Sequence, residues 1–375
     1  MEPDMYSEQW NKLAGLTREM KTPDPAAKAE ARRRLDAIAK PLDGLGLFEK
    51  MIERIAGMQE SADVHTDPAR LLVFCADNGI VEEGVTQSDA SVTAAVAGSL
   101  GRGTSSVCRM AQAAGIDTMP VNIGIRDLLD GIAGAEKVKD CCIRHGTRNF
   151  RREPAMDPQE AYDALCLGMD LVKEARDAGY RILLTGEMGI GNTTTSAAMA
   201  AILTGTQVDI VTGRGAGLDD AGLQRKCLVI REGLERYGFA IREGGLREPA
   251  EVFRLLCCVG GLDIAGMAGV FMGGALYGIP VVIDGVISAV AAMTAERMIR
   301  GCSEYMLPGH QGKEPAMKLL LEALGLQAPI HAELALGEGT GAVMMLALLR
   351  MAMCVYLGNT GFAALGMDAY ERFTT

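Results

Sequence analysis

A chain of 375 residues is long enough for one large domain with a smaller attached unit. Hydrophobic residues make up 49% of the sequence and aromatic residues only 5%, with 46 glycines, a composition that favours close-packed α/β layers with tight turns over an all-β sandwich. The net charge of −11 excludes a nucleic-acid-binding surface, which needs clustered Lys and Arg. A small anionic ligand remains possible, because a few local donors suffice for one phosphate.

The ten cysteines predict free thiols in a reducing compartment. They include two adjacent pairs, Cys141–Cys142 and Cys257–Cys258, but no CxxC motif and no His-rich cluster of the kind that binds zinc. We therefore expect neither disulfides nor a metal site.

Targeting and membrane signals are weak. The N-terminal MEPDMYSEQWNKL carries acids and lacks the apolar core of a signal peptide. The apolar region 259–293 is broken by Pro280 and Asp284, and the apolar stretch 342–356 is too short to span a bilayer. We expect a soluble, cytoplasmic protein without membrane contacts.

The first part of the chain is helical in pattern. Thr22 or Asp24 can cap a helix that carries Pro25 in its first turn and stops at Pro41. Apolar residues then recur at helical intervals over 47–58. These two helices predict a peripheral unit that precedes the main sheet.

From Arg70 onward, short apolar strands alternate with glycine turns and helices. We predict strands in RLLVFCADNG and TMPVNIG, at 181–185, 208–211 and 281–283, and helices at 157–178, 193–203, 249–258, 261–275, 287–300 and 341–356. This order predicts a parallel sheet covered on both faces, with right-handed crossovers. Ligands of such sheets bind beyond the carboxyl ends of the strands, so the following turns should gather at one edge: 75–79, 186–193, 213–219, 284–286 and 337–341. The glycine-rich segment 259–275 predicts close helix packing or a subunit contact.

The strongest local signal is RILLTGEMGIGNTTTSAAMA at 181–200. Its glycines, including Gly189 and Gly191, allow backbone N–H groups to approach an anion, and Asn192 and Thr193 can cap the helix whose positive end faces that point. The motif is neither a Walker loop nor the usual dinucleotide fingerprint. We interpret it as a phosphate cradle, with Glu187 as an unusual acid beside it; the alternative is a tight turn that needs glycine only for packing.

A second glycine turn, GRGAGLDD at 213–220, offers Arg214 and the backbone of Gly215. Lys226 follows about two helical turns later, and together with the 189–193 turn it could hold a phosphate by charge-assisted hydrogen bonds. The alternative for Arg214 and Lys226 is an exposed charge at a helix entrance.

Several acids follow the predicted strands and turns. Glu338 lies between two glycines in LGEGTGA, where exclusion of water would raise its pKa toward that of a general base; it could instead be an acid that stabilises a helix start. Asp77 and Asn78 follow the first strand in the same way. A nucleotide with a ribose and a positively charged base would suit both these acids and the phosphate cradle. His310, in LPGHQGKEP, either donates to a phosphate or ties down its loop.

These motifs resemble one family closely. TGEMGIGNTTT, GRGAGLDDAGL, VGGLDIAGMAG, PVVIDGVISAVAA and LGEGTGAVM, together with RLDAIAKPLDGLG and ADNGIVEEGVT near the N-terminus, are similar to the motifs of nicotinate-nucleotide:dimethylbenzimidazole phosphoribosyltransferases of cobamide biosynthesis. The match spans nearly the whole chain and keeps the motif order.

The resemblance implies a Rossmann-like parallel sheet with helices on both faces. It also implies a small helical domain built from both chain ends, 1–62 and 344–375, beside a large α/β catalytic domain at 63–343. The family forms homodimers in which the neighbouring subunit completes the site. Its substrates would be nicotinate mononucleotide and an aromatic base or phenol, with no cofactor.

The implied reaction transfers the 5-phosphoribosyl group to a cobamide lower-ligand base and releases nicotinate. The resemblance assigns the catalytic base to Glu338. It assigns binding roles to Glu187, the phosphate turn Gly189–Thr193, Gly215 and Lys226. Because nicotinate leaves from a pyridinium, the reaction requires neither a metal nor an acid, and the incoming nitrogen inverts the configuration at C1′ from β to α.

Three places depart from the family pattern: 42–44, 90–93 and Gly309 before His310. They leave the phosphoribosyl-binding residues in place and predict a changed acceptor pocket. An alternative function follows from them, a paralogous and weakly active partner subunit of a heterodimer that uses a phenolic or other atypical acceptor.

Overall fold

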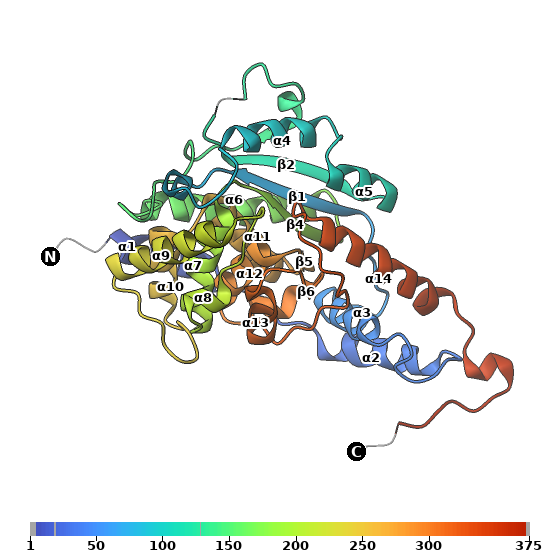
Figure 1. Cartoon of the computed structure of the whole chain (residues 1–375). Helices are drawn as coiled ribbons and strands as arrows, with labels where there is room; N and C mark the ends of the chain where they lie inside the picture. The colour runs from blue at the N-terminus through green and yellow to red at the C-terminus, as the bar shows by residue number, and fades with distance from the viewer. Residues whose placement is uncertain (1–4, 19, 128, 373–375) are drawn as a thin grey trace.

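A six-stranded parallel sheet forms the centre of the protein, with helices on both sides (Figure 1). The computed structural model describes residues 5–18, 20–127 and 129–372. The strands are β1 (Ala69–Ala76), β2 (Asp117–Gly124), β3 (Lys139–Asp140), β4 (Ile182–Met188), β5 (Val281–Ile283) and β6 (Met306–Pro308). They lie in the order β3-β2-β1-β4-β5-β6, and the predicted parallel α/β sheet is confirmed.

The strand order reverses between β1 and β4. The chain adds β2 and β3 on one side of β1 and then returns, so that β4 pairs with the other side of β1, Phe74 opposite Glu187. At such a reversal the two following loops diverge and leave a crevice at the carboxyl edge. The turns after β1 and β4 therefore meet there.

Helices cover both faces of the sheet in layers. On one face lie α4 (Ser91–Gly101), α5 (Ser106–Ala114) and the start of α14 (Thr340–Gly358). On the other lie α11 (Leu262–Tyr277) and α12 (Val286–Met298), with α6 (Pro158–Asp177) outside α11, and with α7 (Asn192–Thr204), α10 (Pro249–Val259) and α13 (Ala316–Ala323) outside α12. The remaining elements are α1 (Met5–Leu16), α2 (Pro25–Ala37), α3 (Leu47–Met58), α8 (Val208–Val211), α9 (Asp220–Arg236), η1 (Gly79–Glu83), η2 (Ala135–Lys137), η3 (Cys302–Tyr305) and η4 (Phe362–Leu365).

One predicted strand is wrong. Residues 208–211 form the short helix α8, in which Val208 and Val211 are buried on one side while Ile210 is exposed. Such a short apolar run does not distinguish a strand from a helix, and here the buried positions are three residues apart. The strand β3 and the helix α13 were not predicted, although the buried residues of α13 recur at helical spacing.

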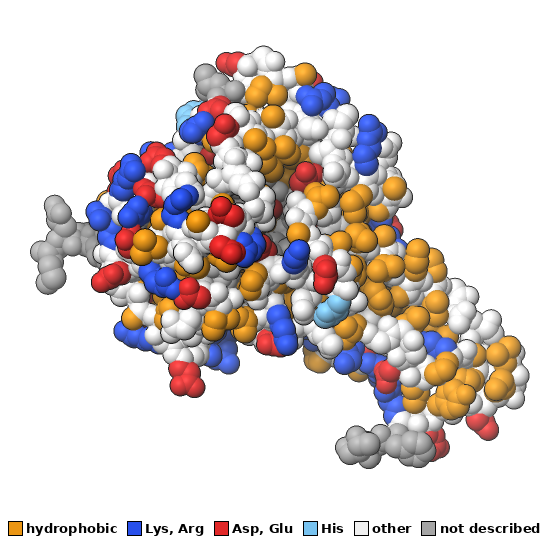
Figure 2. Space-filling model, viewed as in Figure 1, with side chains coloured by type: hydrophobic (Ala, Val, Ile, Leu, Met, Phe, Trp, Pro, Cys, Tyr) orange, Lys and Arg blue, Asp and Glu red, His pale blue; other side chains and the backbone are white. Residues whose placement is uncertain are grey.

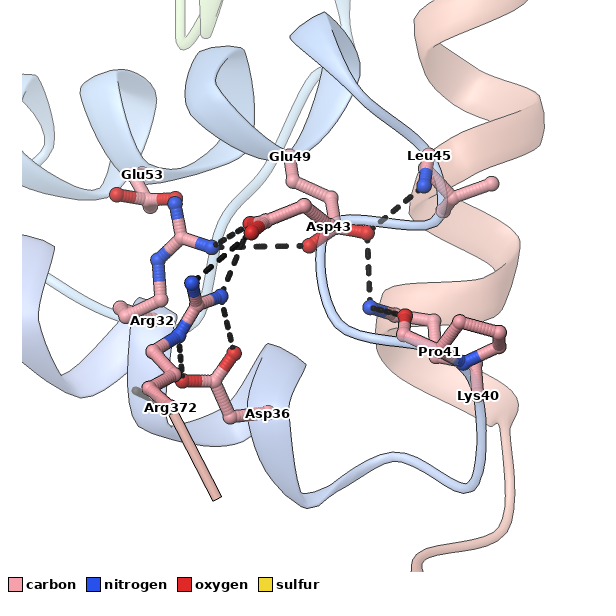
Figure 3. A network of polar contacts seen from close by, with 9 residues as sticks. All are labelled: Arg32, Asp36, Lys40, Pro41, Asp43, Leu45, Glu49, Glu53 and Arg372. Atoms are coloured by element: carbon pink, nitrogen blue, oxygen red, sulfur yellow. Dashed lines mark hydrogen bonds and ion pairs between the residues drawn. The ribbon is translucent and has the colours of Figure 1, made fainter. Parts of the chain in front are cut away.

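The C-terminal segment meets the helices α2 and α3 (Figure 3). Arg372 donates to Asp36 and Asp43, and Arg32 pairs with the same Asp43 at 2.6 Å. In the adjoining turn, the fully buried Glu49 accepts from Lys40 and from a backbone N–H. These ion pairs tie the C-terminal segment to the KPLDGLG turn at 40–46.

The N-terminal helix α1 lies elsewhere, against α6 and α10 at the other end of the molecule (Figure 1). Only α2, α3 and the end of α14 with the segment after it gather into the small helical unit. The exact division into 1–62 with 344–375 and 63–343 stays a prediction. Of the two capping residues considered for α2, Asp24 makes the hydrogen bonds, and the helix ends at Ala37, before Pro41.

The length argument for the last helix was wrong. α14 runs over 19 residues and is long and apolar enough to cross a bilayer, although half of its most apolar window is buried in the protein. Arg350 from its middle donates to the carbonyl oxygens of Ala114 and Thr66 and pairs with Asp67. These contacts bind α14 to the folded chain as a core helix.

Glycines set the closest helix contact, between α6 and α11. A Cβ on Gly168 would lie 2.1 Å from the carbonyl oxygen of Gly266, and one on Gly269 would lie 2.1 Å from that of Leu165. The two backbones therefore touch, and the prediction of close helix packing within 259–275 is confirmed.

We predict that Gly168→Ala destabilises the protein by about 1–3 kcal/mol, because the added methyl group forces two packed backbones apart. Urea unfolding measures the change. Gly15→Ala is the matched control: it also lies in a helix, but no atom lies within 4 Å of its added Cβ, so a gain of up to about 1 kcal/mol is expected. Equal stability of the two variants would contradict the contact.

Candidate active site

A cavity of about 230 Å³ opens at the carboxyl edge of the sheet. Segments from four of the five predicted turns and loops line it, together with the loop after β6: residues 187–193, 215–216, 284–288, 310, 312–314 and 334–337, with Thr86. The fifth turn, after β1, lies behind it and bonds to it, since the N–H of Asn78 donates to the carbonyl oxygen of Ile190. The prediction that these turns gather at one edge is confirmed.

The glycine turn after β4 forms one wall. A Cβ on Gly189 would lie 2.4 Å from the carbonyl oxygen of Ala76, so only glycine fits there, and Gly191 has a φ of +94° as it leads into α7. The predicted capping by Asn192 or Thr193 is wrong: Gly191 is the N-cap residue, and no side chain among the described residues caps this helix.

Asn192 instead connects two acids. Its Nδ2 donates to Glu187 and, over 3.0 Å, to the fully buried Asp263 at the start of α11. Both N–H bonds of the amide are therefore directed at carboxyl groups. Burial, and then the nearby charge of Asp263, raise the pKa of Glu187 to about 8, and burial raises the pKa of Asp263 to about 6.

Lys226 is fully buried, so its alternative as an exposed charge is wrong. Its Nζ donates to Thr193 Oγ1 over 2.9 Å and to the carbonyl oxygen of Gly213 over 3.2 Å, and burial lowers its pKa to about 8. No carboxylate of the described chain lies within ion-pair distance of it. An ammonium has three N–H donors, so one remains for a ligand. A buried charge of this kind is costly unless a ligand compensates it.

Arg214 does not join this wall. Its guanidinium bonds to the Leu218 carbonyl oxygen and to Asp220 and is half-exposed, which agrees with the alternative of an exposed charge at a helix entrance, and a phosphate contact stays a prediction. Gly215, with a φ of +53°, does line the cavity.

Glu338 lies at the edge of the cavity, next to the lining residue Gly337. It is partly buried, has a φ of +58°, and its Oε2 accepts from the N–H of Val107 in the first turn of α5 over 3.3 Å. A Cβ on Gly337 would lie 2.8 Å from Glu187 Oε1, which brings the two acids predicted from distant motifs to the same place.

Asp284 fixes this turn. Its carboxylate, buried at the end of β5, accepts from the N–H groups of Gly339 and Ala342 over 3.2 and 3.0 Å. Burial raises its pKa. His310 is buried beside it, with Nδ1 3.8 Å from Asp284 Oδ1, and it also lines the cavity.

Asp77 and Asn78 support the site from behind. Asp77 accepts from Thr93 Oγ1 and from the N–H of Arg126, and Asn78 accepts from Thr195 Oγ1 in α7. Both are buried among these partners rather than exposed in the cavity, so a direct ligand contact is not supported.

Sequence reasoning missed Glu314. Its Oε1 accepts from the N–H of Gly215 over 3.2 Å, inside the cavity. The signal was present in LPGHQGKEP, where only His310 attracted attention. Glu314 follows a glycine-rich loop at the sheet edge, so the same pattern that indicates His310 also indicates Glu314 as a candidate site residue.

The cavity thus has two chemically different ends. One is formed by the glycine turns, behind which the buried Lys226 ammonium donates to the lining residue Thr193, and it suits an anion. The other holds Glu187 and Glu338, which suit a group that carries hydroxyls, N–H bonds or positive charge. Among the described residues, no group of His, Cys, Asp and Glu is arranged to hold a metal ion. All ten cysteines are free thiols, as predicted.

Comparison with known proteins agrees with this arrangement. A family model described as phosphoribosyltransferase matches residues 20–366. The nicotinate-nucleotide–dimethylbenzimidazole phosphoribosyltransferase of Acetivibrio thermocellus is 37% identical over 340 residues, which is 91% of this chain and 93% of that protein. The chain belongs to this phosphoribosyltransferase family. The enzyme of the same name from Pseudomonas putida is 35% identical over 91% of this chain and 94% of its own.

A solved phosphoribosyltransferase structure agrees in fold. The crystal structure of CobT from Thermus thermophilus has a TM-score of 0.83 at 33% sequence identity and covers 92% of this chain and 99% of that chain. The family assignment made from the motifs is therefore confirmed. The alternative of a weakly active partner subunit is not favoured by these matches.

We predict that Glu187→Gln stabilises the folded protein increasingly as pH rises. The folded state holds the Glu187 proton up to about pH 8, whereas the unfolded chain releases it near 4.5. The free energy of unfolding of the wild type therefore falls as pH rises through this window. It does not fall in this way for Glu187→Gln, because Gln does not titrate. The gain at pH 8.5 is on the order of a few kcal/mol, at about 1.4 kcal/mol per pKa unit.

Urea unfolding at pH 5 and pH 8.5 measures this difference. Glu8→Gln on the surface of α1 is the control and should change little at either pH. A gain that is larger at pH 5 than at pH 8.5 would contradict a protonated Glu187.

Proposed function

We propose that this chain transfers the 5-phosphoribosyl group of nicotinate mononucleotide to an aromatic base such as 5,6-dimethylbenzimidazole. The products would be an α-ribosyl nucleotide and nicotinate. The observation that carries the proposal is a cavity with the buried ammonium of Lys226 behind its lining residue Thr193, with Glu187 in its wall and with Glu338 at its edge beside Gly337. The names of the relatives, nicotinate-nucleotide–dimethylbenzimidazole phosphoribosyltransferases, support the same substrates.

In this proposal the 5′-phosphate binds at the Lys226 end. The third N–H of Lys226 would donate to a phosphate oxygen, and the turn from Gly189 to Thr193 and the backbone of Gly215 would surround it. A phosphate dianion would compensate the buried ammonium, which makes binding of the charged group favourable there.

The sugar then extends toward Glu338, with C1′ between the leaving nicotinate and the incoming base. Nicotinate leaves from a pyridinium, so the C1′–N bond breaks without protonation of the leaving nitrogen. The unprotonated ring nitrogen of the acceptor attacks C1′ from the opposite face, which inverts β to α. Glu338 would accept the proton from the other ring nitrogen, and its charge would stabilise positive charge at C1′.

Glu187 would act differently from Glu338. Since its pKa is about 8, it carries a proton near neutral pH and can donate an O–H bond while its other oxygen accepts from Asn192. We assign it to orient a ribose hydroxyl or the acceptor. Asp77, Asn78 and His310 would hold the turns that bring these groups together.

We predict that Glu338→Gln lowers kcat by about 10²- to 10⁴-fold, the usual contribution of a general base. The protein should fold normally, because the Gln amide oxygen can still accept from Val107. The assay incubates the purified chain with nicotinate mononucleotide and either dimethylbenzimidazole, adenine or phenol, and measures released nicotinate.

Circular dichroism and thermal melting of the variant serve as the folding control. Release by the wild type with at least one acceptor supports the proposed function. If the wild type releases nothing with any acceptor, but does so after a paralogue is added, the proposal of an independent enzyme fails.

We also propose that the chain acts as a cytoplasmic homodimer that associates through α14. Met344, Leu348 and Met351 are exposed on one face of this helix, by 38%, 39% and 67%. In Figure 2 this face belongs to a broad band of hydrophobic side chains. Leu336, 53% exposed beside the cavity, continues it, so a partner bound there would lie close to the acceptor end of the site.

We predict that Met351→Glu converts the dimer to a monomer, because a pair of buried carboxylates would face each other across the symmetric contact. Light scattering after size-exclusion chromatography measures the mass. Ile210→Glu, an equally exposed apolar residue on α8, is the control and should leave the dimer intact. A wild type that is monomeric would overturn the homodimer.

A further inference from the structure

Glu314 makes an unusual contact inside the cavity. It lies in the loop between β6 and α13, and its Oε1 accepts from the N–H of Gly215 over 3.2 Å. A Cβ on Gly213 would lie 1.9 Å from Glu314 Oε2, so the 213–215 turn has room for this carboxylate only because it begins with glycine. The acid is thus fitted into the turn proposed to surround the phosphate.

The same carboxylate acts on Lys226. It lies beyond ion-pair distance, but its negative charge is the main interaction that favours the charged form of this buried ammonium. Lys226 also donates to the carbonyl oxygen of Gly213, at the start of the turn that Glu314 contacts. One backbone N–H and one buried ammonium therefore face a carboxylate that belongs to the chain itself.

A carboxylate and a phosphate compete for such a place. Both are anions that accept charge-assisted hydrogen bonds from backbone N–H groups. Two anions held together in a partly buried cavity repel each other strongly, because the effective dielectric constant there is lower than in water. When a phosphate dianion binds beside Lys226, keeping the Glu314 carboxylate at the Gly215 N–H costs free energy.

We propose that the Glu314 carboxylate is an internal substitute for the substrate phosphate, which leaves the Gly215 N–H when the 5′-phosphate binds. The inference rests on the proposed function for the identity of the phosphate. Before binding, the carboxylate keeps the N–H bonded and partly compensates Lys226. Competition from the Glu314 carboxylate makes phosphate binding weaker. It also makes product release easier, because the carboxylate can return to the Gly215 N–H.

The test is the affinity for inorganic phosphate, measured by titration calorimetry. Glu314→Gln keeps the size and an acceptor for the Gly215 N–H but removes the charge, so the variant should bind phosphate about 5- to 10-fold more tightly. This range corresponds to about 1–1.4 kcal/mol, the difference between charged and neutral hydrogen bonds, with tenfold for each 1.4 kcal/mol. The KM for nicotinate mononucleotide should fall by a similar factor.

Glu322→Gln on α13 is the matched control. It removes the same charge from the helix that follows this loop, but its side chain is exposed and pairs with Lys318, so phosphate affinity should not change. Thermal melting checks that each variant folds. If Glu314→Gln fails to fold, Glu314→Ala provides the same test: it removes the charge and leaves the Gly215 N–H open to phosphate, so it should also bind phosphate more tightly than wild type.

Unchanged or weaker phosphate binding in the folded Glu314 variants would overturn the proposal, since the acid would then be a neutral or supporting contact. A crystal structure with phosphate gives a second test: the distance from Gly215 N to Glu314 Oε1 should exceed hydrogen-bond length, and an unbroken bond would overturn it. Neither measurement requires turnover. Tighter phosphate binding by a protein that releases no nicotinate would therefore refute the proposed function alone.

Discussion

The arrangement of the site depends on one buried carboxylate. Asp284, at the end of β5, accepts from the N–H groups of Gly339 and Ala342 and so fixes the first turn of α14 to the sheet edge. The favourable interaction of an anion with a helix N-terminus strengthens this contact. It places Glu338 at the cavity and directs α14 past α5 to the small helical unit, where Arg372 of the C-terminal segment pairs with Asp43 in the turn before α3 (Figure 3).

The charges of the cavity explain why one protein can hold two unlike substrates. The buried acids Asp263 and Asp284 lie near the partly buried Glu187, and their negative charges add to the effect of desolvation on the pKa of Glu187. Lys226 is buried behind the glycine turns, where it donates to Thr193 and to a carbonyl oxygen. A molecule with an anionic end and a hydrogen-bonding or cationic end matches this distribution of charge. Binding in the reverse orientation would place the anionic end beside the acids.

The sequence predicted the positions of the turns better than the directions of the side chains. Strand order and the glycine motifs placed Gly189, Glu187 and Glu338 at one edge because parallel strands end together. Arg214 and Asp77 were selected by the same reasoning, but Arg214 donates to the Leu218 carbonyl oxygen and Asp77 accepts from Thr93. Asn192 donates to two acids and does not cap the helix. The direction of each of these side chains depends on hydrogen-bond partners that are distant in the sequence. It therefore cannot be predicted from the spacing of residues within one motif.

The turn around Glu338 consists of three successive residues with left-handed backbone, Gly337 at φ +83°, Glu338 at +58° and Gly339 at +95°. A side chain is tolerated only at the middle position, and there at some energetic cost. The position of the Glu338 carboxylate therefore depends on the length of this turn as well as on its residues. Inserting or deleting one residue would rotate the carboxylate away from the cavity.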